Sequence, residues 1–236
     1  MEQTIYQTKE EILKVISTGR ERTNVLKKYE QATIAYLVKR IPEWLNSDML
    51  TAIGFMGSII TFASFVLATY FSVYFLLLGI IGYAISWFGD SLDGRIAYYR
   101  NKARKWYVFA LDITADWLGL ILMGVGFVVY VDGPWEIVGF GFVVMYGWEM
   151  ITTLLRYKIT GKYSIDSGIF GPTEVRIVIS MILTLEVFFK GSILYISSAV
   201  TIILFIINII DTKKLLKLAD ACDELEKEQK RSKNAQ

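Results

Sequence analysis

Histidine is absent from this chain of 236 residues, and cysteine occurs once, at Cys222. A single cysteine excludes an internal disulfide, and the lack of histidine removes the commonest general base and every zinc site that contains histidine. A strong charge of one sign is also missing, because the formal net charge is +2. The overall charge therefore gives no reason to expect nucleic acid as a partner, and we expect none. Carboxylates remain as the metal ligands or proton carriers that the chain can offer.

Apolar residues are abundant instead and make up 54% of the sequence. This share is too high for an ordinary soluble domain. The first 39 residues are charged and mixed, without the short apolar core and the small-residue cleavage site of a secretory signal. We therefore expect the chain to enter a membrane through internal segments.

Six apolar runs are long enough to cross the hydrocarbon core of a bilayer. They cover residues 49–70, 73 to the acidic segment at 89–94, 108–130, 134–155, 171–189 and 192–210. Before them, apolar residues recur at helical spacing between residues 23 and 45, which predicts an amphipathic helix on the membrane surface. The residues of this apolar stripe are Val25, Tyr29, Ala32, Tyr36, Leu37 and Ile41, and Asn46 with Ser47 predicts an N-cap before the first run. The expected fold is thus an all-α integral membrane protein with about six transmembrane helices. Its expected parts are an N-terminal region (1–47), a transmembrane domain (48–211) and a helical tail (212–236).

The loops between the apolar runs alternate in charge. Basic residues are frequent in the N-terminal region, in the loops at 95–105 and 156–162, and in the C-terminal tail, whereas the other loops contain almost none. Because cytoplasmic loops are enriched in lysine and arginine, we expect both termini and the acidic segment to face the cytoplasm. The expected location is the cytoplasmic membrane of a prokaryote.

Four carboxylates flank the loop at 95–105. Asp90 and Asp93 are three residues apart near the end of one apolar run, and Asp112 and Asp116 are four apart near the start of the next. Each pair shares a helix face, and the short loop predicts that the two helices are antiparallel neighbours with converging acidic faces. Charges buried there would each cost ~2.5 kcal/mol or more at full membrane depth. Magnesium, manganese or calcium would offset this cost, and two ions about 4 Å apart would suit phosphoryl chemistry.

The order of these residues resembles the signature of the CDP-alcohol phosphotransferase family. That signature is Asp-x-x-Asp-Gly-x-x-Ala-Arg, followed after a spacer by Gly-x-x-x-Asp-x-x-x-Asp. The matching residues here are Asp90, Asp93, Gly94, Ala97, Asp112 and Asp116. The resemblance extends to the start of the first span, with Asn46, Leu50, Thr51 and Gly54, and to the segment Gly-Pro-Thr-Glu-x-Arg at 171–176.

The resemblance implies a function for the site. Asp90, Asp93 and Asp112 would hold two Mg²⁺ or Mn²⁺ ions, while Asp116 would be the general base and would also touch a metal. The acceptor oxygen would attack the β-phosphorus of a CDP-linked lipid or alcohol, CDP-diacylglycerol being the expected donor, and CMP would leave. The implied role is the synthesis of phospholipids or related polar lipids by a homodimer among membrane lipids, with the active site facing the cytoplasm.

Two positions depart from the signature. Tyr98 stands where the family has arginine, and Val108 stands where it has glycine. With Gly94 and Ala97, these two residues form the expected donor-binding segment. A basic residue at position 95, 100 or 104 would then have to supply the missing positive charge.

The basic residues Arg156 and Arg176 are candidates for binding a polar or phosphorylated acceptor alcohol. For Arg176, a helix start with Pro172 in its first turn and a Glu/Arg pair explains the same segment without any ligand, and the basic loop at 156–162 also fits the charge rule for cytoplasmic loops. Glu149, inside the fourth run, would pair with a buried arginine, line the substrate cavity or make a polar contact between helices.

Two other functions are compatible with the sequence. A family member with lost or altered activity would act as a metal-, nucleotide- or lipid-binding membrane protein, and Tyr98 and Val108 motivate that alternative. A cation transporter would use the acids as a path. The clustering of the acids at one membrane face argues against transport, because the outer halves of the spans offer no further carboxylate besides Glu186.

Overall fold

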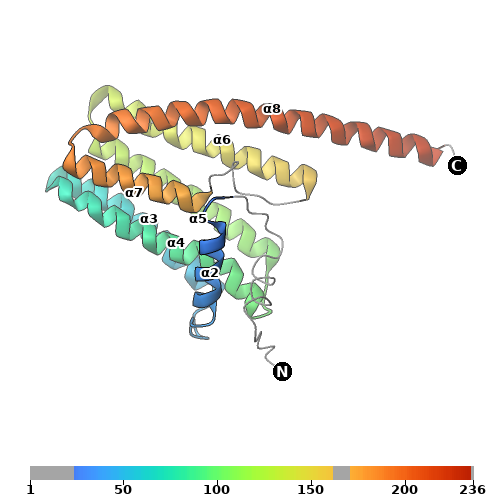
Figure 1. Ribbon diagram of the computed structural model, residues 1–236, viewed down its shortest axis with the longest axis horizontal. Helices are drawn as coiled ribbons and strands as arrows, with labels where there is room; N and C mark the ends of the chain where they lie inside the picture. The colour runs from blue at the N-terminus through green and yellow to red at the C-terminus, as the bar shows by residue number, and fades with distance from the viewer. Residues whose placement is uncertain (1–23, 162–170, 235–236) are drawn as a thin grey trace.

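The computed structural model describes residues 24–161 and 171–234, and this part of the chain consists of helices, turns and loops without a strand (Figure 1). The predicted all-helical class is confirmed. The helices are α2 (Lys27–Val38), α3 (Ser47–Tyr70), η1 (Val73–Phe75), α4 (Leu76–Tyr99), α5 (Lys105–Tyr130), η2 (Gly133–Trp135), α6 (Glu136–Thr160), α7 (Pro172–Phe188) and α8 (Ser192–Asn234).

Five of these helices, α3, α4 with η1, α5, α6 with η2, and α8, are long and apolar enough to cross a membrane. The helix α7 has 17 residues and a length of about 25 Å, somewhat less than the hydrocarbon thickness of a bilayer. The structure therefore supports an integral membrane protein with five candidate spans, and the sixth span remains a prediction.

Two helix starts follow from local sequence signals. The Asn46 side chain accepts a hydrogen bond from the backbone N–H of Met49 at 2.9 Å, which confirms the predicted N-cap of α3. The helix α7 begins at Pro172, where the missing N–H costs nothing, and the Glu174 side chain accepts from the backbone N–H of Gly171 at 3.0 Å. These interactions connect residues at most three positions apart.

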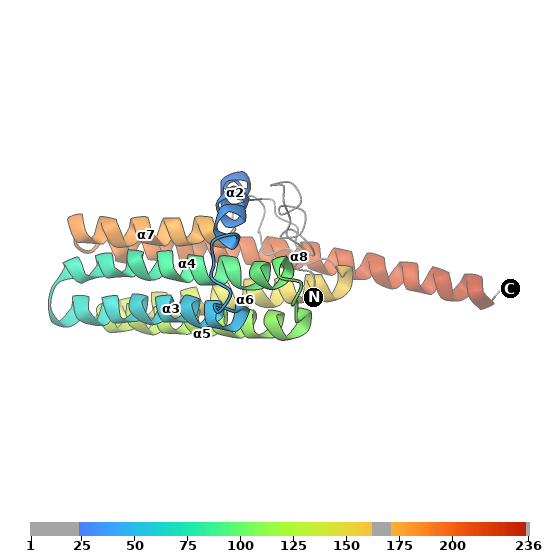
Figure 2. The same ribbon diagram turned by 90° about the horizontal axis from the view of Figure 1, so that it is seen from below.

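The long helices lie roughly parallel, and α3 is central to the half of the bundle that carries the acidic residues (Figures 1 and 2). The helices α4 and α5 both pack along α3 and touch each other only slightly, while α6 packs against α8 and α7 lies between α4 and α8. The helix α2 crosses the bundle axis steeply and packs on α4.

Glycines let α3 and α4 approach closely. A Cβ atom on Gly57 would lie 2.5 Å from the carbonyl oxygen of Gly82, and one on Gly89 would collide with the backbone nitrogen of Gly54. Small residues at such contacts allow two backbones to pack tightly inside a membrane. This close packing places the acidic end of α4 directly beside α3.

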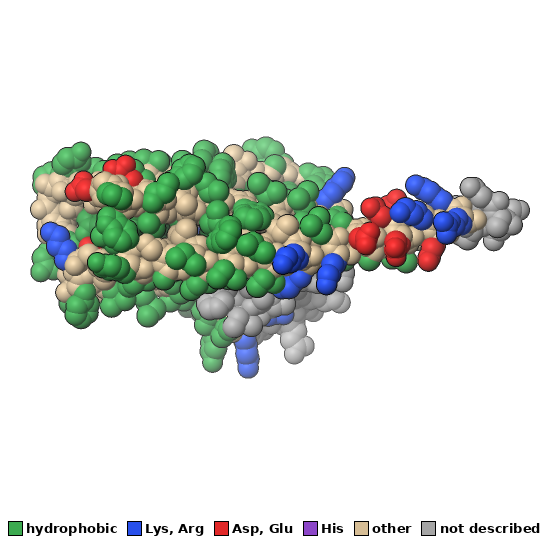
Figure 3. Space-filling view, turned by 90° about the horizontal axis from the view of Figure 1, so that it is seen from above, with side chains coloured by type: hydrophobic (Ala, Val, Ile, Leu, Met, Phe, Trp, Pro, Cys, Tyr) green, Lys and Arg blue, Asp and Glu red, His purple; other side chains and the backbone are tan. Residues whose placement is uncertain are grey.

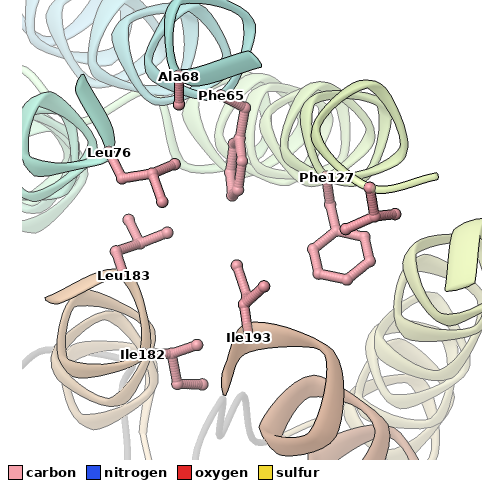
Figure 4. Packing of buried hydrophobic residues seen from close by; sticks show 8 residues of the cluster. Phe65, Ala68, Leu76, Phe127, Ile182, Leu183 and Ile193 are labelled. Atoms are coloured by element: carbon pink, nitrogen blue, oxygen red, sulfur yellow. The ribbon is translucent and has the colours of Figure 1, made fainter. Parts of the chain in front are cut away.

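Two clusters of buried apolar side chains hold the bundle together. One joins the end of α3, the start of α4, the end of α5 and the α7–α8 turn, and Figure 4 shows Phe65, Leu76 and Leu183 pointing into it. The other lies at the opposite end of α3 and α4 and includes Ile34, Leu50, Leu92 and Ile96. The second cluster fixes α2 to the bundle near the acidic residues.

The buried face of α2 differs from the predicted apolar stripe. Glu30, Ile34, Ala35 and Val38 are buried. Of the expected stripe, Val25, Tyr29 and Tyr36 are exposed, while Leu37 and Ile41 are partly buried against the second cluster. The helix packs by a face that includes a glutamate because that glutamate has partners on α4 and α7.

The last helix, α8, is continuous over 43 residues and extends far beyond the bundle (Figure 1). Figure 3 shows hydrophobic side chains over the bundle and charged ones gathered on the projecting end. Residues 212–234 of the predicted tail thus continue the helix of the last apolar run, and the division of the chain into three parts stays a prediction.

Candidate functional site

Three helices build the acidic site. Asp90 and Asp93 lie in the second half of α4, Asp112 and Asp116 lie in the first half of α5, and α3 supplies Thr51, Gly54 and Ser58 beneath them. Because α4 and α5 both pack on α3, their acidic faces converge over α3. The expected convergence is observed, but it does not come from direct packing of α4 on α5.

Three of the four aspartates come together. One carboxylate oxygen from each of Asp90, Asp112 and Asp116 lies within 4.8 Å of the other two. Between them is a small cavity of about 10 Å³, also lined by Thr51, Gly54, Ser58 and Ser86. This volume corresponds to about one water-sized sphere. An all-oxygen donor set around a space of this size fits a hard divalent cation such as Mg²⁺ or Mn²⁺.

The fourth aspartate, Asp93, is fully buried and lies outside this group of three. Its Oδ2 accepts a hydrogen bond from the Thr51 hydroxyl at 2.7 Å, and its Oδ1 accepts from the backbone N–H of Gly94. These donors hold the Asp93 carboxylate one turn away from Asp90 along α4. Its part in binding a metal stays a prediction.

An arginine from a distant helix completes the acidic group. The Nη1 of Arg176, on α7, lies 2.7 Å from Oδ2 of Asp90, and both side chains are mostly buried. A guanidinium so placed offsets part of the carboxylate charge and fixes the position of Asp90. The other expected basic residue, Arg156, lies 4.0 Å from Asp211 of α8.

A cavity of about 150 Å³ opens beside the acidic group; most of its lining is apolar, and it is called the polar cavity here because charged side chains also line it. Its charged lining residues are Asp116, Glu149 and Arg176, and its walls come from α3 to α7. Asp116 borders both this cavity and the smaller one between the aspartates. Arg156 does not line the polar cavity.

A larger cavity of about 350 Å³ adjoins the polar cavity and is almost wholly apolar. The two cavities share Phe142, Tyr146 and Glu149 among their lining residues.

The three arginines near the signature hold residues 24–48, here called the N-terminal segment, in place. Arg95 is buried, donates to the carbonyl oxygen of Ser91 and lies 3.4 Å from Glu30. Arg100 donates to four backbone carbonyls of residues 41–45. Arg104 pairs with Asp48 at 2.6 Å, and this hydrogen bond raises the pKa of the Arg104 guanidinium. All three therefore have structural contacts in this structure.

The expected donor-binding residues lie at the ends of α4 and α5 that face this N-terminal segment. Gly94, Ala97 and Val108 are buried, and Tyr98 is half-buried. None of the four lines the three cavities described above. Their role in donor binding stays a prediction.

Sequence analysis missed a polar network that joins the N-terminal segment to α7. The Asn24 amide and the backbone N–H of Leu26 donate to Glu174 at 3.0 Å and 2.8 Å. The Thr173 hydroxyl donates to Glu30 at 3.1 Å. No sequence signal marks the pairing, because the partners are more than 140 positions apart in the chain.

Comparison with protein families gives a match over most of the chain. The family model described as CDP-alcohol phosphatidyltransferase matches residues 44–207, more than two thirds of the chain. The matched region includes the four aspartates, Glu149 and Arg176, and it leaves out α2 and the projecting end of α8. No curated protein matches the sequence.

Proposed function

The chain belongs to the CDP-alcohol phosphatidyltransferase family, and we propose that it transfers a substituted phosphate group from a CDP-linked lipid to a polar acceptor alcohol with release of CMP. The family implies a membrane transferase that acts on a CDP-alcohol. The observation that carries the proposal is the group formed by Asp90, Asp112 and Asp116 at the edge of a polar cavity.

In this proposal the acceptor hydroxyl lies in the polar cavity beside Asp116. Asp116 is the best-exposed member of the acidic group and borders both the cavity and the space between the carboxylates. Its carboxylate takes the hydroxyl proton as the oxygen forms a bond to the β-phosphorus. The bond between that phosphorus and the bridging oxygen of the pyrophosphate breaks, and CMP leaves with the electron pair.

Asp90, Asp112 and Asp116 would hold divalent metal, with two Mg²⁺ or Mn²⁺ ions as the proposed cofactors and Asp93 as the proposed further ligand. When bound, such ions neutralise the charge that develops on pyrophosphate oxygens. Arg176 holds Asp90 in its place, so the protein contributes mainly orientation and charge.

The apolar cavity supports a lipid as the donor. It adjoins the polar cavity and has a volume of about 350 Å³. Its almost entirely hydrophobic lining comes from α3, α5, α6, α7 and α8. We propose CDP-diacylglycerol, whose acyl chains would enter this cavity. Arg176 is the proposed acceptor-binding cation because it lines the polar cavity, where it also pairs with Asp90, whereas Arg156 does not line this cavity.

The proposal also covers the placement of the protein. The active site would face the cytoplasm of a prokaryote, with α7 as the sixth span and two copies forming a dimer. Residues 1–47 would form the cytoplasmic N-terminal region, 48–211 the catalytic domain and 212–236 the cytoplasmic tail. The basic loop that joins α4 to α5 at the acidic end of the bundle supports this orientation.

The test is CMP release by the purified protein in detergent with Mg²⁺ or Mn²⁺, CDP-diacylglycerol and a mixture of acceptor alcohols. We expect Asp116→Asn to lower the rate by about 100-fold or more, the usual effect of losing a general base. Asp132→Asn, on the exposed turn before α6, is the matched control and should leave the rate unchanged. Absence of CMP release from any donor and acceptor would overturn the proposal.

A second candidate is a family member that binds a CDP-linked lipid without transferring it. The motivating observation is that Arg95, Arg100 and Arg104 all have structural contacts, so none of them replaces the arginine that Tyr98 displaces. In that case Tyr98→Arg with Val108→Gly should create CMP release or raise it strongly. An unchanged rate would count against this candidate.

A further inference from the structure

One buried carboxylate in the polar cavity has no hydrogen-bond donor. Both carboxylate oxygens of Glu149, on α6, are buried and accept no hydrogen bond from the described residues 24–161 and 171–234. A buried carboxylate without donors is unfavourable, and such groups are rare in folded proteins unless a ligand completes them. The position of Glu149 therefore points to a missing donor.

Glu149 lies where the polar and the apolar cavity meet, and it lines both together with Tyr146. Asp116 and Arg176 line the same polar cavity. A molecule whose hydroxyl is next to Asp116 would therefore extend within this cavity toward Glu149.

Positive charges near Glu149 are already engaged. Arg156, two turns further along α6, and Lys214 of α8 lie 4.0 Å and 2.9 Å from the carboxylate of Asp211. Arg176 pairs with Asp90 at 2.7 Å. Among the described residues, no lysine or arginine forms an ion pair with Glu149.

The charge balance of the cavity favours a cation. Its charged lining consists of Asp116, Glu149 and Arg176. Asp116 belongs to the proposed metal site and Arg176 pairs with Asp90, so Glu149 is the charge in this cavity that lacks an ion-pair partner among the described residues. An acceptor with a phosphate would bring a further negative charge toward Glu149, where no cation is free to meet it. An acceptor with an ammonium group would bring both a compensating charge and three hydrogen-bond donors.

We propose that Glu149 binds the ammonium group of an amine-bearing acceptor alcohol and so determines the class of acceptor. This inference rests on the proposed transferase function. The hydroxyl of the acceptor loses its proton to Asp116 and forms the new bond to phosphorus, while the ammonium group keeps its protons and donates to Glu149. Glu149 takes no part in bond making and acts as a specificity residue.

The test compares acceptors of similar shape but different charge. CMP release from CDP-diacylglycerol is measured with ethanolamine and L-serine on one side and ethylene glycol, glycerol and glycerol 3-phosphate on the other. In the unmodified protein we expect kcat/KM to be at least about tenfold higher for an amine-bearing acceptor. Glu149→Gln should abolish this preference by raising the KM for that acceptor.

Two variants serve as controls. Glu149→Asp keeps the charge and should retain part of the preference, which a merely structural role would not predict. Glu136→Gln changes an exposed glutamate in the first turn of α6 and should behave like the unmodified protein. Highest activity with glycerol 3-phosphate, or a preference for amines that survives in Glu149→Gln, would overturn the inference while the transferase function stands.

A binding measurement separates the two proposals if no acceptor supports CMP release. The thermal unfolding midpoint is then recorded in detergent with ethanolamine or ethylene glycol. A rise with ethanolamine that is lost in Glu149→Gln would support the amine site although the transferase function fails. Equal midpoints with both compounds, or an equal rise in the variant, would overturn the amine site as well.

Discussion

The two ends of the helix bundle use buried carboxylates differently. Where α7 turns into α8, Glu186 is 2% exposed, and its oxygens accept from the Tyr130 hydroxyl and the backbone N–H groups of Gly191 and Ile193. Beside Asp116, the oxygens of Glu149 are buried without any donor from the described chain. The difference teaches that the chain itself supplies the hydrogen-bond donors of a carboxylate that serves the fold. The carboxylate for which we propose a ligand receives no such donors from the described chain.

The largest expected effect is at the acidic end. Asp112→Asn removes one of the three gathered carboxylates, and we expect CMP release to fall by about 100-fold or more because a proposed metal ligand and its charge are lost. Metal titration followed by isothermal calorimetry should show weaker Mn²⁺ binding in this variant. Unaltered CMP release and Mn²⁺ affinity would show that the three carboxylates have no common metal.

The same substitution at the two glutamates tests the comparison directly. Glu186→Gln replaces an acceptor oxygen with an amide donor that faces backbone N–H groups, and we expect a loss of about 1–3 kcal/mol in unfolding free energy. Glu149→Gln should leave the thermal unfolding midpoint unchanged or raise it, because a buried charge without donors is removed. Equal destabilisation by both variants would contradict the distinction between a structural and a ligand-binding carboxylate.

A smaller effect is expected at Thr51, whose hydroxyl donates to Asp93 at 2.7 Å. Thr51→Val keeps the shape but removes the donor, and we expect activity to fall by about tenfold, as for the loss of one hydrogen bond to a charged group. Thr51→Ser should retain most of the rate. Measured kcat values for both variants decide whether the hydroxyl, or only the packing of α3, positions the Asp93 carboxylate.

The smallest effect concerns the exposed pair Arg104–Asp48. Its hydrogen bond raises the pKa of Arg104 in the folded protein. The pair therefore contributes its full stabilisation at any pH below the pKa of the unfolded arginine. This contribution is lost only as the pH rises through the pKa of the folded protein. The contribution should therefore be constant between pH 6 and pH 9, since arginine titrates above about pH 12. Arg104→Gln should lower the unfolding midpoint slightly and equally across this range, and a pH-dependent change would contradict the assignment.

Much of the fold could be predicted because it depends on local sequence. Long apolar runs predicted α3, α5, α6 and the start of α8, and the Asn46 cap and the Pro172 start were evident from a few neighbouring residues. The gathering of Asp90, Asp112 and Asp116 was also predicted, because spacing of three and four residues places side chains on one helix face.

Only the tertiary structure decided which residues meet across helices. The position of α3 between α4 and α5, the burial of Glu30 beside Arg95, and the separation of Asp93 from the other aspartates all depend on packing between distant segments. The lack of a hydrogen-bond donor at the Glu149 carboxylate likewise depends on tertiary packing, since it is a property of the cavity that five helices line. The sequence by itself determined the helices, their apolar surfaces and the set of acids, because these follow from nearest neighbours along the chain. The partners of each charge were decided by the tertiary structure, because hydrogen bonds and ion pairs act over a few ångströms in space, whatever the distance along the chain.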